Sequence, residues 1–193
     1  MKLLFAILAA FALVAGCKEE RQKTEQKMEA TAEVQTPKAN SNPQVVMETD
    51  SGAIVLELYP AEAPITVENF LKLVNRKFYD GLTFHRVIPN FMIQGGDPKG
   101  DGSGGPGWTI KGEFGARKHL RGTLSMARTS DPNSAGSQFF ICVAPAAYLD
   151  GQYAAFGQAT EGLEVLDKIV NVRRDGMDKP LAPIHIKRAY VKP

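Results

Sequence analysis

Few cysteines and histidines occur in this chain, which limits its options for cross-linking and metal chemistry. Its 193 residues include two cysteines, Cys17 and Cys142, and three histidines, at positions 85, 119 and 185. Two cysteines do not make a disulfide framework, and no ligand spacing such as His-Glu-x-x-His is present. Cys142 lies in the apolar run Phe139–Val143, where a cysteine usually behaves as a small hydrophobic residue. We predict neither a metal site nor a catalytic thiol.

Charge of one sign is not in excess either. Lys and Arg number 23 against 21 Asp and Glu, which gives a formal net charge of +2. Removal of residues 1–16 would take away one cation, Lys2, and leave 22 basic against 21 acidic residues. A chain this close to neutral argues against nucleic-acid binding.

The apolar run at the start of the chain is too short to span a membrane. It covers Leu3–Val14, follows Lys2 and precedes the small residues Ala15 and Gly16. A membrane-spanning helix needs roughly 20 apolar residues, and no stop-transfer segment follows here. The pattern therefore predicts a secretory signal peptide over residues 1–16.

The segment Leu13–Cys17 resembles the lipobox of bacterial lipoproteins, in which the cysteine becomes the acylated first residue of the mature protein. Small residues before Cys17 and the charged residues 18–20 after it favour this interpretation over a signal peptide with an incidental cysteine. The resemblance implies an exported protein held in the bacterial cell envelope by its lipid, because several acyl chains give durable attachment. Lys18, in place of Asp, favours the periplasmic face of the outer membrane over the inner membrane in a cell that has both.

Bulky apolar residues are scarce from Cys17 to Pro43. This stretch consists mainly of Glu, Lys, Gln, Thr and Ala, with prolines at 37 and 43, and such a composition cannot bury enough surface to fold. We predict a lipidated cysteine and flexible tether over residues 17–43 and one folded domain over residues 44–193.

Alternating apolar residues dominate the predicted domain. Residues 44–58 alternate on both sides of a turn at Asp50-Ser51-Gly52, which predicts a β-hairpin. The other strand-like runs are Thr83–Ile88, Phe91–Gly95, Gly122–Ala127, Gln138–Val143, Ala154–Ala159 and Ile184–Val191. Helical spacing after Pro64 and again over Gly162–Val170 predicts two amphipathic α-helices. Eight strands with two helices favour a mainly β fold, a closed barrel. The long segment between Pro98 and Lys118 is too rich in glycine to be regular.

One segment, Phe84–Asp97, sets a permanent cation and an amide among large apolar side chains. A guanidinium stays protonated at any working pH, so Arg86 must act through hydrogen bonding and charge. Rotation about an amide bond is a reaction that needs only a hydrogen bond and a charge. An isolated arginine on a strand is usually just solvated, but the apolar neighbours of Arg86 would make an unpaired charge costly. His85 points the other way and is interpreted as a buried, hydrogen-bonded histidine.

Three strings of residues together resemble the cyclophilin family of peptidyl-prolyl cis-trans isomerases. They are Phe84–Asp97, then Leu124–Arg128 with Gly136–Ile141, then Leu149–Gly151 with Phe156-Gly157. The resemblance implies a closed eight-stranded antiparallel β-barrel capped by two α-helices, and isomerisation of X-Pro bonds without a cofactor. An eight-stranded barrel is filled by its own side chains, so a peptide must bind on the outer wall.

The resemblance also implies roles for particular residues. Arg86 is the catalytic residue, and Gln94, eight residues further on the neighbouring strand, holds its guanidinium in place. The substrate-binding residues are Phe91, Met92, Ala127, Arg128, Thr129, Gln138, Phe140, Tyr148, Leu149 and Tyr153. The chain is one residue longer after Thr129 than the commonest members, which leaves the alignment of Thr129 open. Arg128, commonly Asn there, contributes backbone bonds for which its side chain should matter little.

Other interpretations remain open at this point. Phe91, Met92, Phe139 and Phe140 could all be plain core, although strand alternation sends Phe139 and Phe140 to opposite faces. The sequence thus predicts a monomeric isomerase that binds proline-containing polypeptides and speeds the folding of exported proteins. Alternatives are a non-catalytic proline-peptide-binding chaperone or assembly factor, and a structural lipoprotein. Tyr148, where many members have Trp, implies weakened binding of the family inhibitor cyclosporin.

Overall fold

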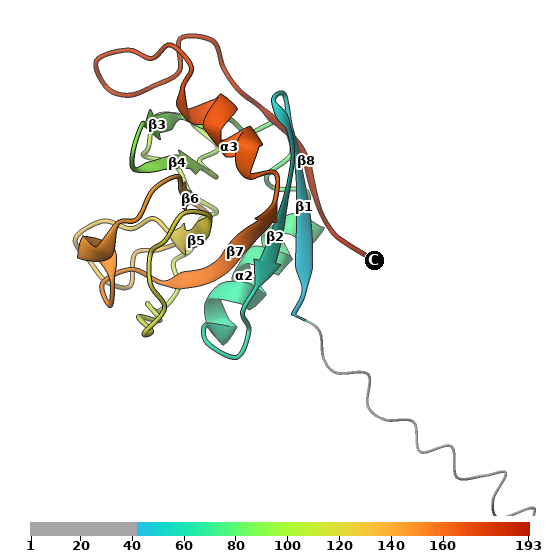
Figure 1. Ribbon diagram of the computed structural model, residues 1–193. Coiled ribbons are helices and arrows are strands. Elements are labelled where there is room, and N and C mark those ends of the chain that lie inside the picture. Colours follow the sequence, from blue (N-terminus) through green and yellow to red (C-terminus); the bar gives the residue numbers. More distant parts are fainter. Residues whose placement is uncertain (1–41) are drawn as a thin grey trace, which may run out of the picture. The chain divides into compact units, whose positions relative to one another are not determined.

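The computed structural model describes residues 42–193; the predicted signal peptide, Cys17 and all but the end of the predicted tether lie outside this range. In the described part, eight antiparallel strands form one curved sheet, accompanied by two α-helices and a short 3-10 helix (Figure 1). The elements in chain order are β1 (Gln44–Thr49), β2 (Gly52–Leu58), α2 (Pro64–Asn75), β3 (Arg86–Ile88), β4 (Met92–Gly95), β5 (Thr123–Met126), β6 (Phe139–Cys142), η1 (Ala147–Leu149), β7 (Ala155–Glu161), α3 (Leu163–Val170) and β8 (Ile186–Val191).

The sheet has the strand order β3-β4-β6-β5-β7-β2-β1-β8. Its two edge strands approach each other through the segments that precede them, where Thr83 bridges His185 and the Phe84 N–H donates to the Ile184 carbonyl at 3.0 Å. The free edge of β3 bonds elsewhere, because the Val87 N–H donates to Asp178 in the loop before β8, at 2.8 Å. The mainly β fold is therefore confirmed, but a closed barrel overstates it, since the sheet curls into a half-barrel.

The predicted hairpin and helices begin and end close to the expected residues. β1 pairs with β2 from Gln44 opposite Glu57 to Thr49 opposite Gly52. Helix α2 begins at Pro64, which suits the first helical position because its missing N–H would have no helical partner there. Helix α3 follows Gly162, which has a φ of 81°. A Cβ at this position would collide with the Ala53 carbonyl oxygen, so both the backbone angle and the space require glycine.

Aromatic rings fill the inside of the sheet. The Phe70 ring of α2 lies 5.8 Å from the Phe139 ring at 90° and 5.2 Å from the Phe156 ring. Tyr79 is fully buried beside them and donates its hydroxyl to the Ser137 carbonyl at 3.2 Å. Because these side chains occupy the interior, a ligand has to bind on the outer face.

Two residues that precede the predicted domain, Asn42 and Pro43, are bonded to the sheet. The Asn42 side-chain amide donates to Glu57 at 2.7 Å, and the Leu58 N–H donates to the Pro43 carbonyl at 2.9 Å. The last two residues of the predicted tether are thus bonded to β2.

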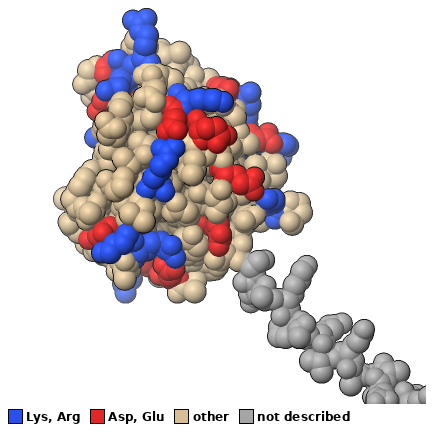
Figure 2. All heavy atoms as spheres, viewed as in Figure 1, with Lys and Arg blue, Asp and Glu red and all other residues tan. Residues whose placement is uncertain are grey.

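The surface carries charges of both signs. On the face shown in Figure 2, Lys and Arg side chains alternate with Asp and Glu. Paired examples in the structure are Arg188 with Glu48 and Arg121 with Asp167. Across residues 42–193 no helix reaches the length and apolarity that membrane crossing requires, and no three potential metal-ligating side chains gather.

Candidate active site

Register across three strands sets a row of side chains on the outer face of the sheet. Arg86 of β3 lies opposite Gln94 of β4, and Gln94 lies opposite Phe140 of β6. Successive side chains of a strand point to opposite faces, so the intervening Ile93 and Phe139 enter the core. Phe140 belongs instead to a separate outer cluster, which confirms the expected divergence of Phe139 and Phe140.

A hollow of about 290 Å³ opens beside this row. Every residue that lines it was predicted from the sequence as a site residue. These residues are Arg86, Phe91, Met92, Gln94, Ala127, Arg128, Phe140, Tyr148, Leu149 and Tyr153. The structure therefore brings these residues together from strands and loops that are far apart in the chain. Thr129 and Gln138, also nominated, line a neighbouring hollow.

The floor of the hollow is apolar. Met92, Phe140 and Leu149 are buried, with 1%, 5% and 7% of their surfaces exposed. The Phe91 ring lies 5.7 Å from the ring of Tyr148, and Tyr153 meets Phe140 edge-on at 5.9 Å. A small apolar ring can therefore be enclosed on several sides and kept from water.

Arg86 lies at the rim and is exposed, which corrects the expectation that its apolar sequence neighbours surround it. Those neighbours, such as Val87, point into the core because strand alternation separates them from the guanidinium. The Arg86 Nη1 donates to Gln94 Oε1 at 3.5 Å, and Gln94 Nε2 donates to Gln138 Oε1 at 2.9 Å. The cation thus lies at the end of a chain of amides.

The glycine-rich loop completes this chain of amides. Gln138 Nε2 donates to the carbonyls of Gly102 and Gly104, at 2.9 and 2.8 Å. The loop itself folds around the buried Asp97 carboxylate, which accepts the backbone N–H groups of Lys99 and Asp101 at 2.8 and 3.1 Å. Burial alone would raise the pKa of Asp97, but these N–H groups outweigh it and lower the pKa below its ordinary value. The carboxylate therefore stays charged and holds the loop against Gln138.

A second hollow, of about 620 Å³, adjoins the first. It shares Gln94, Ala127 and Arg128 with the first and is lined further by the glycine-rich loop, Trp108 and Ser134. The sequence alone indicates no role for this loop, because its glycines predict irregular structure without showing where the chain returns. The indole N–H of Trp108 donates to Asn69 of α2 at 2.9 Å, and this contact anchors the loop to the helix.

The side chain of Arg128 has bonds of its own between the two hollows. Its guanidinium donates to the Gln152 carbonyl at 2.9 and 3.1 Å and lies 4.6 Å from the centre of the Tyr153 ring. Backbone pairing with a peptide does not use these contacts. The sequence offered no sign of them, since Gln152 is 24 residues away.

Burial shifts the pKa values of two further residues, His85 and Cys142. His85 is buried, as expected, but neither ring nitrogen has a protein hydrogen-bond partner among residues 42–193, so the expected bond to another protein group is not found there. Burial lowers the pKa of His85 and favours its neutral form. Burial also raises the pKa of Cys142 to about 12, so this thiol stays protonated at neutral pH.

Comparisons with known proteins agree with this geometry. Residues 44–191 match the family model described as cyclophilin type peptidyl-prolyl cis-trans isomerase/CLD. A peptidyl-prolyl cis-trans isomerase of Synechococcus elongatus is 53% identical over 133 residues, covering 69% of this chain and 90% of that protein. Peptidyl-prolyl cis-trans isomerase B of Bacillus subtilis is 52% identical over 124 residues, covering 63% and 86%. A crystal structure of a Cryptosporidium parvum cyclophilin in the presence of the dipeptide Ala-Pro superposes with a TM-score of 0.75 at 37% identity, covering 78% of this chain and 99% of that one.

Proposed function

The chain belongs to the cyclophilin-type peptidyl-prolyl cis-trans isomerases, and from this premise we propose that Arg86 speeds X-Pro rotation by hydrogen bonding to the prolyl nitrogen in the twisted transition state. Gln94 orients the guanidinium, and the apolar hollow holds the pyrrolidine ring. The substrates are proline-containing polypeptides. No cofactor takes part.

The chemistry of the amide bond explains why a hydrogen-bond donor is sufficient. Resonance opposes rotation with a barrier of about 18–20 kcal/mol. In the twisted state this resonance is lost, and the prolyl nitrogen regains a lone pair that can accept a hydrogen bond. A donor at that position binds the transition state more tightly than either planar isomer, and such differential binding lowers the barrier.

One observation carries the proposal: the guanidinium of Arg86 lies at the rim of an apolar hollow and is tied back by Gln94 at 3.5 Å. The buried floor formed by Met92, Phe140 and Leu149 suits the methylene groups of a pyrrolidine ring. An enclosed ring would keep competing water from the donor, which strengthens the contact.

The test is turnover of a short X-Pro peptide by Arg86→Ala, measured by NMR exchange. Removal of one preorganised donor is expected to lower kcat by about 10²–10³-fold, while the fold persists because the side chain is exposed. Arg188→Ala is the matched control, because Arg188 is an exposed strand arginine paired with Glu48 outside the hollow. Unchanged turnover in Arg86→Ala would refute the mechanism, whereas wild-type turnover no faster than the uncatalysed rate would favour the non-catalytic peptide-binding chaperone.

The dependence of kcat on pH provides an independent check. A guanidinium does not titrate in the working range, so the rate is expected to stay nearly flat from about pH 6 to 8. A steep bell-shaped profile would instead indicate an acid or base such as His85.

The proposal extends to location. Cys17 carries the lipid, and the residues between Cys17 and Asn42 tether the isomerase domain. The enzyme assists folding of exported proteins in the bacterial envelope, at the periplasmic face of the outer membrane where there are two membranes. The support is the sequence Leu13–Cys17 followed by Lys18. Incorporation of a labelled fatty acid into the wild type, its loss in Cys17→Ser, and membrane fractionation test this. Equal labelling of both proteins would contradict it.

The functional protein is a monomer. Its outer hollow also binds cyclosporin, with an affinity weakened because Tyr148 has no indole N–H. Sedimentation velocity of the domain tests the first statement, and a sedimentation coefficient that rises with protein concentration would contradict it.

A further inference from the structure

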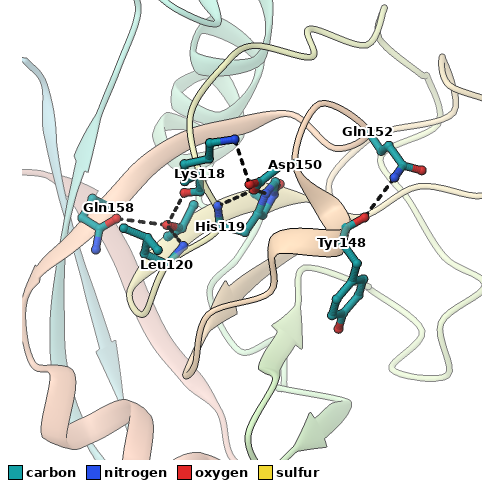
Figure 3. Close-up of polar contacts among 9 residues, drawn as sticks. Lys118, His119, Leu120, Tyr148, Asp150, Gln152 and Gln158 are labelled. Carbon is teal, nitrogen blue, oxygen red and sulfur yellow. Dashed lines mark hydrogen bonds and ion pairs between the residues drawn. The ribbon is translucent and has the colours of Figure 1, made fainter.

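A buried histidine joins two parts of the wall behind the hollow. His119 has no exposed side-chain surface. Its backbone N–H and its Nδ1 both lie within hydrogen-bonding distance of one carboxylate oxygen of Asp150, at 2.8 and 3.1 Å (Figure 3). Its other ring nitrogen, Nε2, lies 3.1 Å from Ser125 Oγ. Both ring nitrogens are therefore partnered, in contrast to those of His85.

These contacts fix the state of the ring. A carboxylate can only accept, so Nδ1 carries the proton and Nε2 accepts from the hydroxyl of Ser125. Burial lowers the pKa of His119 more than the neighbouring Asp150 raises it, which keeps the ring neutral near neutral pH. Ser125 is fully buried, so this Ser-His-Asp arrangement cannot present a nucleophile to a substrate.

The same ring lies directly behind Phe140. The two rings are nearly parallel, with 6.0 Å between their centres and 16° between their planes. Ser125, which the histidine contacts, is the cross-strand partner of Phe140. The histidine therefore supports the position of Phe140 through its ring and through the neighbouring strand.

The histidine also holds the opposite wall of the hollow. Asp150 comes immediately after η1, which contributes Tyr148 and Leu149 to the lining of the hollow. The Ala146 N–H, at the start of η1, donates to the His119 carbonyl at 2.8 Å. Both ends of η1 are thus bonded to one residue, whose ring also contacts β6.

We propose that His119 is a positioning residue that sets the spacing between Phe140 and Leu149, and so the fit of the proline ring. The inference rests on the proposed function, because it takes the apolar hollow as the proline site. Phe140 and Leu149 contact the ring in the planar and twisted states alike. Misplacing them weakens binding of both states and raises the peptide Kd, with a small effect on kcat.

The chain supplies a matched control. His185 has the same pattern, with its backbone N–H and Nδ1 at 2.8 and 2.9 Å from one oxygen of Asp50. Lys187 approaches the other Asp50 oxygen, as Lys118 approaches that of Asp150. His185 lies before β8 and outside the lining of the hollow.

The experiment compares His119→Phe with His185→Phe, using NMR titration with a short Ala-Pro peptide for Kd and exchange spectroscopy for kcat. We expect His119→Phe to raise Kd by about fivefold or more, with kcat within about twofold of the wild type, and His185→Phe to leave both unchanged. A folded His119→Phe with wild-type Kd, or with a loss confined to kcat, would overturn the proposal. Failure of the Arg86 mechanism is separate, because it would appear as unchanged kcat in Arg86→Ala.

A second pair of variants covers the case in which His119→Phe does not fold. Asp150→Ala removes the carboxylate from a partly exposed position and is expected to raise Kd in the same way, whereas Asp150→Asn keeps an acceptor oxygen and recovers most of the loss. Equal Kd values in the two Asp150 variants would overturn the proposal. In the wild type, ¹⁵N NMR of the His119 ring should show a protonated Nδ1 and an unprotonated Nε2, and the opposite tautomer would contradict the assigned bonds.

Discussion

The two faces of β4 and β6 have the same kinds of residue but different surroundings. On the inner face Ile93, Phe139 and Ile141 join the main core. On the outer face Met92 and Phe140 join a small separate cluster. Both sets are almost fully buried, so burial alone does not distinguish structural residues from those of the site.

The difference lies in what covers each face. The inner face is packed on several sides by rings such as those of Phe70 and Tyr79. The outer face is covered mainly by η1 and by the side chains of Phe91 and Tyr153, which leave a hollow of about 290 Å³. A filled interior leaves the outer wall as the place for the proposed peptide site. Under that proposal, residues adjacent in the sequence have different roles, one set in the core and one in binding.

Replacing each phenylalanine in turn by alanine tests whether the two faces differ in role. Phe139→Ala is expected to lower the free energy of unfolding by about 3–5 kcal/mol, because its surroundings are too well packed to collapse into the cavity. Phe140→Ala is expected to lose less than half as much, since its site borders solvent, but to raise the Kd of an Ala-Pro peptide by tenfold or more, about 1.4 kcal/mol. Urea denaturation and NMR titration measure the two quantities. Similar stability losses with unchanged Kd would show that the two faces do not differ in role.

His85 and His119 extend the comparison to buried polar groups. Burial lowers the pKa of both, so the unfolded chain binds more protons than the folded one as the pH falls below about 6.5, the ordinary histidine value. Stability should therefore decrease as the pH falls from 7 to 5. His85→Leu is expected to raise the free energy of unfolding by about 1–3 kcal/mol, because it removes buried nitrogens without partners, and to flatten this decrease. Denaturation midpoints at several pH values measure the effect, and a variant that is less stable at pH 5 would contradict it.

Helix α2 packs on the inner face, and a contact at its first residues can be removed without changing the hollow. The carboxylate of Glu113 accepts the Thr66 N–H at 2.8 Å and the Ile65 N–H at 3.1 Å at the start of the helix, which has no side-chain cap from its own preceding residue. Glu113→Ala is expected to cost about 1 kcal/mol of stability without a change in peptide Kd. Glu68→Ala, an exposed glutamate on the same helix, is the control. A weakened Kd in Glu113→Ala would show that the two faces are coupled.

Local periodicity was sufficient to predict most of the fold. The helical spacing after Pro64 predicted a helix, and α2 is found there with Val67, Phe70 and Val74 buried. Alternation correctly separated Phe139 from Phe140. Barrel closure could not be predicted in this way, because it depends on whether β3 bonds to β8 or to Asp178, and the strand pattern is the same in both cases.

The same distinction applies to the site: contacts between neighbouring strands could be predicted, and contacts made through loops could not. The interval of eight residues between Arg86 and Gln94 placed them on adjacent strands, and the structure sets them opposite each other. The contact of His119 with Asp150 spans 31 residues, and that of Gln138 with Gly104 spans 34. Such pairings are determined by the return path of loops, for which neither periodicity nor residue type gives a signal.

Tyr148 at the rim gives the smallest expected effect and tests how adaptable the outer face is. Its side chain is 64% exposed and contacts Phe91, so a larger ring can be placed there without disturbing the core. Tyr148→Trp is expected to tighten cyclosporin binding by about fivefold, because an added indole N–H contributes about one hydrogen bond, near 1 kcal/mol. Tyr148→Phe, which keeps the ring and adds no donor, should bind cyclosporin as the wild type does. Isothermal titration calorimetry measures all three affinities, and equal affinities in the wild type and Tyr148→Trp would show that the inhibitor does not use a donor at this part of the rim.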